Sequence, residues 1–320
     1  MIELKTVPSS PQRNFLTPTH VRQERLPPWF KVRPTTGPNY IKLRRLVDEL
    51  GLHTVCEEAQ CPNIWECWNV GTATFMILGE ICTRSCGFCS VDFGRPNELD
   101  DDEPRRLAGA IAALGISHAV ITSVNRDELE NGGAEIFAAS IEHIRANTPG
   151  CAVEVLIPDF QGKRSALQMV LTAKPNVLAH NIETVPRLYR VVRPQAKYER
   201  SLQVLSWAKQ SGAITKTGMM LGLGESLDEV RSVMCDLIEI GCDILTLGQY
   251  LQPTHRHLPV SRFVSPAEFD QLKKEGEAMG LSHVESGPLV RSSYHAEKQL
   301  AAATHFDDEP NFKTQTRTPY

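Results

Sequence analysis

The chain has 320 residues, 41% of them hydrophobic and 22% charged, which is enough for a buried core in one α/β barrel domain or in two smaller domains. The 34 basic residues nearly balance the 38 acidic ones and form no long run, which argues against nucleic acid or a membrane surface as the main partner. The first thirty residues lack the apolar stretch of a signal peptide, and no later run could span a bilayer, so we expect a cytoplasmic protein.

The N-terminal part of the chain changes character twice. Residues 1 to about 40 are rich in proline and polar side chains and predict an extended or irregular segment. The stretch IKLRRLVDELG then predicts a helix, because its apolar residues recur at helical spacing and Gly51 can terminate it. Three cysteines follow in the segment CEEAQCPNIWEC, namely Cys56, Cys61 and Cys67.

From residue 72 onward one pattern repeats: a short apolar run, a loop with polar residues or glycine, and an amphipathic helix. The apolar runs, each predicted to be a strand, cover residues 72–78, 118–123, 152–158, 176–182, 213–221 and 243–249. Two helices begin with capping boxes, Ser226 with Glu229 and Ser265 with Glu268. Strands that are apolar on both faces and alternate with helices predict a parallel sheet covered by helices.

Both a doubly wound sheet and a barrel match this alternation. A dinucleotide-binding doubly wound sheet concentrates its chemistry at one switch point with a G-x-G-x-x-G turn, and the segment GLGE is not that turn. Polar segments instead follow almost every predicted strand, as expected where several strand ends converge on one mouth. The pattern therefore favours a barrel.

A second cysteine triplet follows the first of these strands. The segment CTRSCGFC holds Cys82, Cys86 and Cys89 with the spacing C-x3-C-x2-C, and thiolates suit zinc or iron–sulfur clusters. A structural zinc site needs four ligands, and neither triplet has a fourth cysteine or a well-spaced histidine beside it; His53, the nearest, is more typical of a surface residue. A zinc knuckle or a reactive loop is the alternative, which the spacing disfavours.

The chain has nine cysteines, and those outside the two triplets stand singly among apolar residues. They are Cys151, Cys235 and Cys242, which we predict to be reduced residues of the core. A disulfide scaffold is typical of short secreted chains, whereas clustered thiols in a chain of this length bind metal or do chemistry.

The second triplet, with the aromatic Phe88 before its last cysteine, resembles the radical S-adenosylmethionine superfamily. In that superfamily three thiolates leave one iron of a 4Fe–4S cluster open to S-adenosylmethionine, and one electron cleaves it to a 5'-deoxyadenosyl radical. The upstream C-x4-C-x5-C, with PPWFKVR, TSVNRDELENGGA, HNIETV and RSSYHA, resembles the lipoyl synthase family along nearly the whole chain. The resemblance implies a partial (β/α)6 barrel of the TIM type at 71–285, an N-terminal cysteine-bearing extension at 1–70 and a C-terminal tail at 286–320.

The resemblance also implies a reaction and its cofactors. Two 4Fe–4S clusters are expected, a radical-generating one on Cys82, Cys86 and Cys89, and an auxiliary one on Cys56, Cys61, Cys67 and a serine of the RSSY motif, with Ser293 preferred over Ser292. The enzyme would insert two sulfur atoms, supplied by the auxiliary cluster, at C6 and C8 of an octanoyl group on a carrier lysine. The implied partners are the lipoyl-carrier domains of 2-oxoacid dehydrogenase E2 and the glycine cleavage H protein, and a small electron-donor protein.

Residues expected to bind S-adenosylmethionine follow the predicted strands. They are Phe88, Asn125, Gly132, Gly133, Asn181, Glu183 and Arg193. The two glycines would lie against the methionine amino group, although the segment alone is typical of a polar turn. Glu183 could accept from the ammonium or the ribose hydroxyls, and Arg193 could pair with the carboxylate; a surface ion pair between these two residues is the alternative.

Weaker candidates complete the set. In a barrel, Arg126 and Asp127 would point into the mouth with Asn125, while Lys216 and Gln249 would lie at strand ends. His255 and His257 are predicted to be loop residues because no H-E-x-x-H frame surrounds them. Arg291 and Tyr294 flank the two serines and either orient the tail or pack it.

Two other functions stay open at this point. A sulfur-inserting enzyme of the biotin synthase kind leaves the C-x4-C-x5-C and RSSY motifs unexplained. An iron–sulfur or zinc-binding protein without radical chemistry would not need six strand–helix units with polar segments at the strand ends.

Overall fold

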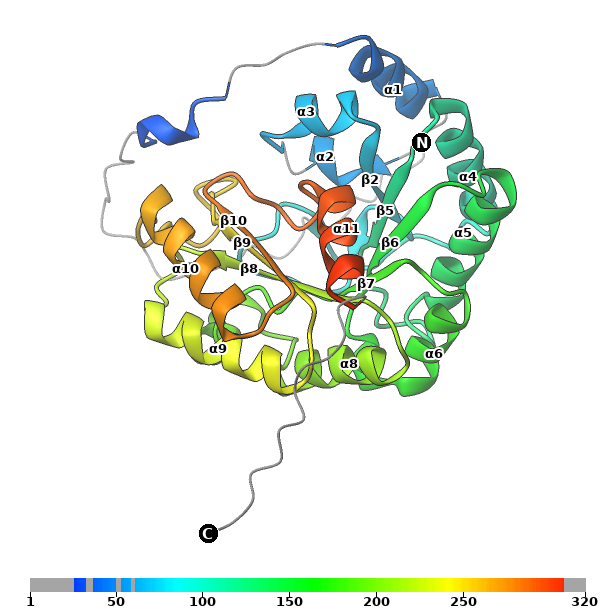
Figure 1. The fold of residues 1–320 in the computed structure, drawn as a ribbon. Coiled ribbons are helices and arrows are strands. Elements are labelled where there is room, and N and C mark those ends of the chain that lie inside the picture. Colours follow the sequence, from blue (N-terminus) through cyan, green and yellow to red (C-terminus); the bar gives the residue numbers. More distant parts are fainter. Residues whose placement is uncertain (1–25, 33–36, 50–52, 59–60, 308–320) are drawn as a thin grey trace, which may run out of the picture.

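One eight-stranded sheet forms the centre of the computed structural model, which describes residues 26–32, 37–49, 53–58 and 61–307 (Figure 1). The strand order is β1–β2–β5–β6–β7–β8–β9–β10. The bounds are β1 (His53–Thr54), β2 (Thr72–Ile77), β5 (His118–Ser123), β6 (Ala152–Leu156), β7 (Val177–Ala179), β8 (Thr215–Leu221), β9 (Ile244–Gln249) and β10 (His283–Gly287). Gly51 and most of the proline-rich N-terminal segment lie outside the described residues.

The sheet is parallel from β2 to β10 and carries β1 as an antiparallel edge strand. Its two edges, β1 and β10, stand at opposite ends of the strand order, so the sheet is open, as in the predicted partial barrel. All six predicted strands are confirmed. The seventh parallel strand, β10, escaped prediction because its segment HVESG holds a single apolar residue.

Helices surround the sheet on its outer side (Figure 1). They are α4 (Glu103–Leu114), α5 (Ala134–Asn147), α6 (Arg164–Thr172), α8 (Tyr198–Gln210), α9 (Leu227–Glu239) and α10 (Pro266–Met279). Both predicted capping boxes are present at the starts of α9 and α10, where the hydroxyls of Ser226 and Ser265 accept hydrogen bonds from backbone N–H groups. The short segments η2 (Phe160–Gly162), η3 (Pro186–Leu188) and α7 (Tyr189–Val192) lie in the loops after β6 and β7.

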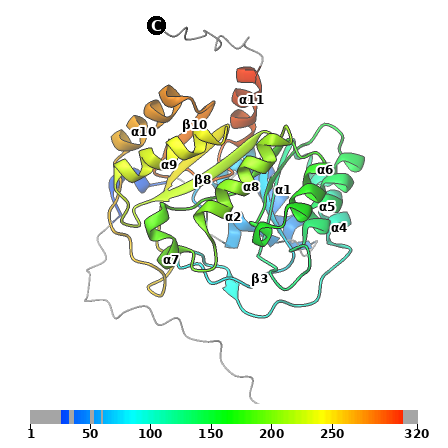
Figure 2. The ribbon, with the colours of Figure 1, turned by 90° about the horizontal axis from the view of Figure 1, so that it is seen from below.

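The N-terminal extension and the C-terminal tail meet beside β2. The extension contains η1 (Pro28–Phe30), α1 (Pro38–Glu49), α2 (Val55–Glu58) and α3 (Ile64–Asn69), and the tail contains α11 (Ala296–Asp307). Glu297 of α11 accepts a hydrogen bond of 3.1 Å from the hydroxyl of Thr72, the first residue of β2. Figure 2 shows α11 on the opposite side of the molecule from β3 (Ile81–Cys82), which pairs with β4 (Asp92–Phe93) around the second cysteine triplet. The proposed domain boundary after residue 285 falls within β10.

The apolar residues of the strands and helices form two buried clusters, one on the β2–β6 side and one on the β8–β10 side. Cys151 and Cys242 are buried, as predicted. The prediction for Cys235 is wrong, because this residue is exposed on α9 and lies off the stripe of buried residues that includes Val233 and Leu237. Within the described residues, none of the helices combines the length and apolar character needed to cross a membrane.

Candidate cluster and cofactor sites

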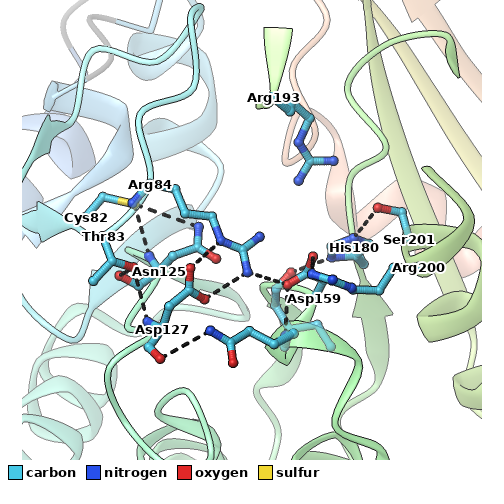
Figure 3. A network of polar contacts seen from close by, with 12 residues as sticks. Cys82, Thr83, Arg84, Asn125, Asp127, Asp159, His180, Arg193, Arg200 and Ser201 are labelled. Carbon is cyan, nitrogen blue, oxygen red and sulfur yellow. Dashed lines mark hydrogen bonds and ion pairs between the residues drawn. The ribbon is translucent and has the colours of Figure 1, made fainter. Parts of the chain in front are cut away.

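The second cysteine triplet begins at the end of β3 and continues in the loop between β3 and β4, and hydrogen bonds hold its first thiol (Figure 3). The sulfur of Cys82 accepts from the backbone N–H groups of Arg84 at 3.4 Å and of Asn125 at 3.3 Å. The side-chain amide of Asn125 lies 3.8 Å from the same sulfur. The loop after β5 therefore fixes the position of this cysteine.

A buried arginine within the triplet loop ties that loop to two strand ends. Nε and Nη2 of Arg84 donate to the two carboxylate oxygens of Asp127 at 2.6 and 2.8 Å, and Nη2 also donates to Asp159 Oδ1 at 2.6 Å. Arg200 completes the network by donating to Asp159 Oδ2 at 3.1 Å (Figure 3). Burial would raise the pKa of Asp159, but the hydrogen bonds and the charge of Arg84 hold it well below its usual range.

Sequence reasoning missed Arg84 and Asp159. The available signals were an arginine inside the cysteine loop and a carboxylate directly after a buried strand. His257, predicted to be a plain loop residue, also contacts the cysteine loop, since its Nε2 lies 2.9 Å from the carbonyl oxygen of Cys89. His255, which lies in the same loop as His257 after β9, is exposed.

The loops after β7 and α7 bring three more of the predicted residues together. Nη1 of Arg193 donates to the carbonyl oxygen of Asn181 at 2.7 Å, and the amide of Asn181 donates to Glu183 Oε1 at 3.1 Å. Glu183 has a φ of +64°, an uncommon backbone conformation for a residue other than glycine. Burial raises the pKa of the Glu183 carboxyl group, while the charge of Arg193 and the hydrogen bond from Asn181 oppose that shift.

Three buried polar atoms in this region lack a hydrogen-bond partner in the described structure: Oδ1 of Asn125, Oδ1 of Asn181 and Nε of Arg193. Figure 3 shows Arg193 extending towards the Arg84 network. Buried polar groups in native proteins are almost always satisfied by protein, water or ligand. These atoms therefore suit a polar ligand such as S-adenosylmethionine, with its amino, carboxylate and adenosine groups.

The two predicted glycines stand at the start of α5. Gly133 is the N-cap of this helix with a φ of +86°, and a side chain at this position would collide with Leu78. Gly132, with a φ of +61°, lines a cavity together with Asn125, Asp127 and Lys163. Phe88 lies partly buried in the cysteine loop.

Three of the weaker candidates have structural contacts instead. Lys216 is the second residue of β8 and not at its end; its Nζ lies 2.8 Å from Glu154 Oε1, and both side chains are buried. The side-chain oxygen of Gln249 accepts from the backbone N–H of Val264 at 2.8 Å. Arg126 donates to the carbonyl oxygen of Leu78 at 2.9 Å.

The first cysteine triplet surrounds a separate cavity. Its lining contains three cysteines, one serine and residues of α3, β2 and the tail: Cys56, Cys61, Asn63, Ile64, Cys67, Thr72, Thr74, Arg291, Ser293 and Tyr294. Ser293, the preferred serine, lines this cavity, and Ser292 is absent from the lining. Burial and, to a smaller extent, the neighbouring Cys61 raise the pKa of the Cys56 thiol to about 11.

Each triplet has a donor set that suits a cluster. Three thiols and a hydroxyl around one cavity match a four-iron cube, in which every iron takes one protein ligand. The second triplet offers three thiols and leaves one position for a small molecule. Within the described ranges, no three His, Cys, Asp or Glu side chains converge on a single-ion site.

Comparisons with known proteins identify the family. Residues 76–237 match the model described as "Radical SAM superfamily", and residues 11–61 match the "N-terminal domain of lipoyl synthase of Radical_SAM family". The chain is 61% identical to the lipoyl synthase of Rubrobacter xylanophilus over 88% of its own length and 90% of that protein. It is 56% identical to the lipoyl synthase of Koribacter versatilis over 85% and 90% of the two chains.

Solved structures share the fold at low sequence identity. The maturase HydG of FeFe-hydrogenase from Carboxydothermus hydrogenoformans aligns with a TM-score of 0.56 and 15% identity over 82% of this chain and 60% of its own. SuiB from Streptococcus suis, bound to S-adenosylmethionine, aligns with a TM-score of 0.52 and 11% identity over 75% and 57%. The partial barrel is thus confirmed, and the relatives do not favour the biotin synthase alternative. The chain belongs to the lipoyl synthase family of radical S-adenosylmethionine enzymes, which use S-adenosylmethionine and 4Fe–4S clusters.

Proposed function

We propose that this chain inserts two sulfur atoms at C6 and C8 of a protein-bound octanoyl group and thereby forms the lipoyl group, with a different task for each cysteine triplet. The observation that supports this division most strongly is the cavity that Cys56, Cys61 and Cys67 share with Ser293. Ser293 lies more than two hundred positions after these cysteines, so no local turn accounts for their meeting.

Cys82, Cys86 and Cys89 are assigned to the radical-generating cluster. This cluster and S-adenosylmethionine, when bound, supply a carbon radical that removes hydrogen from C–H bonds too weakly acidic for an acid–base mechanism. The chain orients this chemistry through Arg84, whose ion pairs with Asp127 and Asp159 hold the cysteine loop against the strand ends.

The residues around the unpartnered atoms are assigned to S-adenosylmethionine. Arg193 is suited to the carboxylate of the methionine moiety, because its Nε points to no protein acceptor. Glu183 is suited to the ammonium group or the ribose hydroxyls. Asn125 and Asn181 offer amide oxygens as acceptors, and Phe88, Gly132 and Gly133 complete the wall around the cofactor.

Cys56, Cys61, Cys67 and Ser293 are assigned to the auxiliary cluster that donates sulfur. A serine oxygen is a harder ligand for iron than a thiolate and is more easily displaced. Cys56, Cys61, Cys67 and Ser293 would hold this cluster, and it would supply the inserted sulfur. Arg291 and Tyr294, which line the same cavity, enclose it.

The protein partners follow from the substrate. The octanoyl group is carried on a lysine of a lipoyl-carrier domain, such as that of a 2-oxoacid dehydrogenase E2 or of the glycine cleavage H protein. A small electron-donor protein is required to reduce the radical-generating cluster. We place this chemistry in the cytoplasm.

The test uses the anaerobically reconstituted protein with S-adenosylmethionine, dithionite and an octanoylated carrier domain. We expect the carrier to gain the mass of two sulfur atoms as the dithiol, and to lose two hydrogens only when the dithiol is later oxidised to the ring, with two molecules of 5'-deoxyadenosine per lipoyl group. Ser293→Ala removes the proposed ligand, and Ser292→Ala is the matched control. We expect only Ser293→Ala to abolish the lipoyl product. A carrier that stays octanoylated while S-adenosylmethionine is cleaved in the wild-type protein would refute the proposed function.

A further inference from the structure

Hydrogen bonds at three places join the segment around the first cysteine triplet to the C-terminal tail. The partners in each bond are more than two hundred residues apart in the sequence. The donors and acceptors are Asn63 Nδ2 with the carbonyl oxygen of Leu289 at 2.6 Å, Glu66 with Tyr294 and His295, and Thr72 Oγ1 with Glu297 Oε2 at 3.1 Å. Asn63 and Glu66 belong to the extension, and Thr72 is the first residue of β2. The contacts therefore enclose the auxiliary cavity on the side where the tail enters it.

Glu66 makes the central contact with both of its carboxylate oxygens. Oε2 accepts a hydrogen bond of 3.0 Å from the Tyr294 hydroxyl, and Oε1 lies 3.1 Å from His295 Nε2. The two rings are stacked with their centroids 3.8 Å apart. His295 Nδ1 also lies 3.4 Å from Glu285 Oε1 in β10, so this ring connects α3 to the sheet.

The backbone around these rings is constrained. His295 has a φ of +54°, an uncommon backbone conformation for a residue other than glycine. The N–H of Tyr294 donates to the carbonyl oxygen of Arg291 at 2.9 Å, which closes a turn that contains Ser293. Glu66 is the immediate neighbour of Cys67, and Tyr294 is the immediate neighbour of Ser293. A contact between Glu66 and Tyr294 thus sets the distance between a thiol and the serine.

We propose that Glu66 is a positioning residue of the auxiliary site, which latches the segment Arg291–His295 onto α3 and so presents the Ser293 hydroxyl to the cavity. Glu66 touches neither substrate nor the reacting atoms, and it acts through Tyr294 and His295. The inference rests on the proposed role of Ser293. It deepens that role by naming the residue that holds the ligand in place.

The experiment compares Glu66→Ala and Tyr294→Phe with Lys298→Ala, an exposed substitution in the same tail. Amide hydrogen exchange of residues 289–300 is measured on the full chain as isolated. Iron loss to a chelator and the Mössbauer spectrum are measured in a second set of proteins that also carry alanine at Cys82, Cys86 and Cys89, so that all iron belongs to the auxiliary site. Because Glu66 is 54% exposed, its removal leaves no buried charge that would prevent folding.

We expect Glu66→Ala to speed exchange in the tail and iron loss by about tenfold, and Tyr294→Phe by a smaller factor, since each removes hydrogen bonds of ordinary strength. The Mössbauer signal of the iron with an oxygen ligand should broaden or disappear, while Lys298→Ala matches the wild type. Wild-type exchange, iron loss and spectrum in Glu66→Ala would overturn the latch. Full lipoyl formation by Ser293→Ala would instead overturn the serine ligand itself, so the two failures are distinguishable.

Discussion

Arg84 illustrates how single residues hold the radical site together. Its guanidinium is almost fully buried and shares three short hydrogen bonds with Asp127 and Asp159. A fork of this kind is specific to arginine, because lysine offers a point charge without the planar geometry. The residue lies two positions after Cys82, so its ion pairs determine where the cysteine loop meets the barrel.

The first prediction concerns this buried network. Arg84→Met should lower the free energy of unfolding by about 3–5 kcal/mol, because it removes three charge-assisted hydrogen bonds and leaves the buried carboxylate of Asp159 with Arg200 as its remaining cationic partner. It should also reduce cleavage of S-adenosylmethionine, and Arg84→Lys should rescue both only in part. The matched control is Arg105→Met, which removes the same two-bond geometry with Asp102 at an exposed position and should leave stability unchanged. Chemical denaturation measures the stability of each variant, and an assay of 5'-deoxyadenosine measures cleavage. Equal stability of Arg84→Met and Arg105→Met would contradict the prediction.

The second prediction concerns the pH dependence of stability at His180. Its ring nitrogens lie 2.9 Å from the Ile157 carbonyl oxygen and 3.0 Å from the Ser201 hydroxyl, and burial, with repulsion from Arg193 second, lowers its pKa from 6.5 to about 4. The unfolded chain therefore binds more protons between these values. The neutral ring contributes fully above pH 6.5, and its contribution is lost as the pH falls towards 4.

A shift of this size corresponds to about 3 kcal/mol at 1.36 kcal/mol per unit. His180→Asn should therefore flatten the rise of unfolding free energy between pH 4 and 6.5, measured by denaturant titration at several pH values. The exposed His143→Asn is the control and should keep the wild-type slope. An unchanged slope in His180→Asn would show that other groups govern stability in this range.

Individual site residues could be predicted from the sequence only where the chemistry depends on the spacing of residues close together in the chain. The six cysteines could be predicted because each triplet lies within a dozen residues. The partners of Arg84 could not, since Asp127 and Asp159 come from other loops and only the folded sheet brings them close. Lys216 was misplaced for the same reason: its neighbours in the chain do not reveal that Glu154, on another strand, neutralises it.

At the scale of elements, the junction between β5 and α5 depends on a glycine pair. Gly133 caps α5 in a left-handed conformation, and the space where a Cβ would stand is filled by Leu78. The turn-forming sequence Asn131–Gly133 therefore has a structural reason to contain glycine, independent of any contact with a cofactor. The turn could be predicted from its asparagine and two glycines, whereas the close approach of Leu78 required the packed structure.

The third prediction follows from this geometry. Gly133→Ala should lower the free energy of unfolding by about 2 kcal/mol, because alanine is strained at a positive φ and collides with Leu78. Gly109→Ala is the matched control: it lies in α4 with open space around its Cβ, and it should stabilise the protein by about 0.5–1 kcal/mol. Thermal or chemical unfolding measures both. Two variants that shift stability in the same direction would contradict the account of Gly133.

The elements themselves were largely predictable because the core strands are apolar on both faces. Thr72–Ile77 is buried along its whole length, which made the strand visible as an apolar run. By contrast, β10 is only partly buried at most positions, and its polar sequence hid it. An edge strand packs on fewer neighbours, so the sequence pattern that marks central strands is weaker there.

On the scale of the whole molecule, two sites are built from different parts of the chain. The auxiliary cavity is lined by the extension, the start of β2 and the tail. The second triplet is held by loops that follow β5 and β6. Neither set of contacts includes a cysteine of the other triplet, so each site should assemble without the other.

The last prediction tests this independence with two triple variants. Replacing Cys82, Cys86 and Cys89 by alanine should abolish cleavage of S-adenosylmethionine and leave about four irons per chain. Replacing Cys56, Cys61 and Cys67 should also leave about four irons, but here cleavage to 5'-deoxyadenosine continues while no sulfur reaches the octanoyl group. Iron and sulfide analysis, with quantification of 5'-deoxyadenosine and lipoyl product, distinguishes the two. Undiminished cleavage in the first variant would refute the assignment of the radical site, and lipoyl product from the second would show that the sulfur has another source.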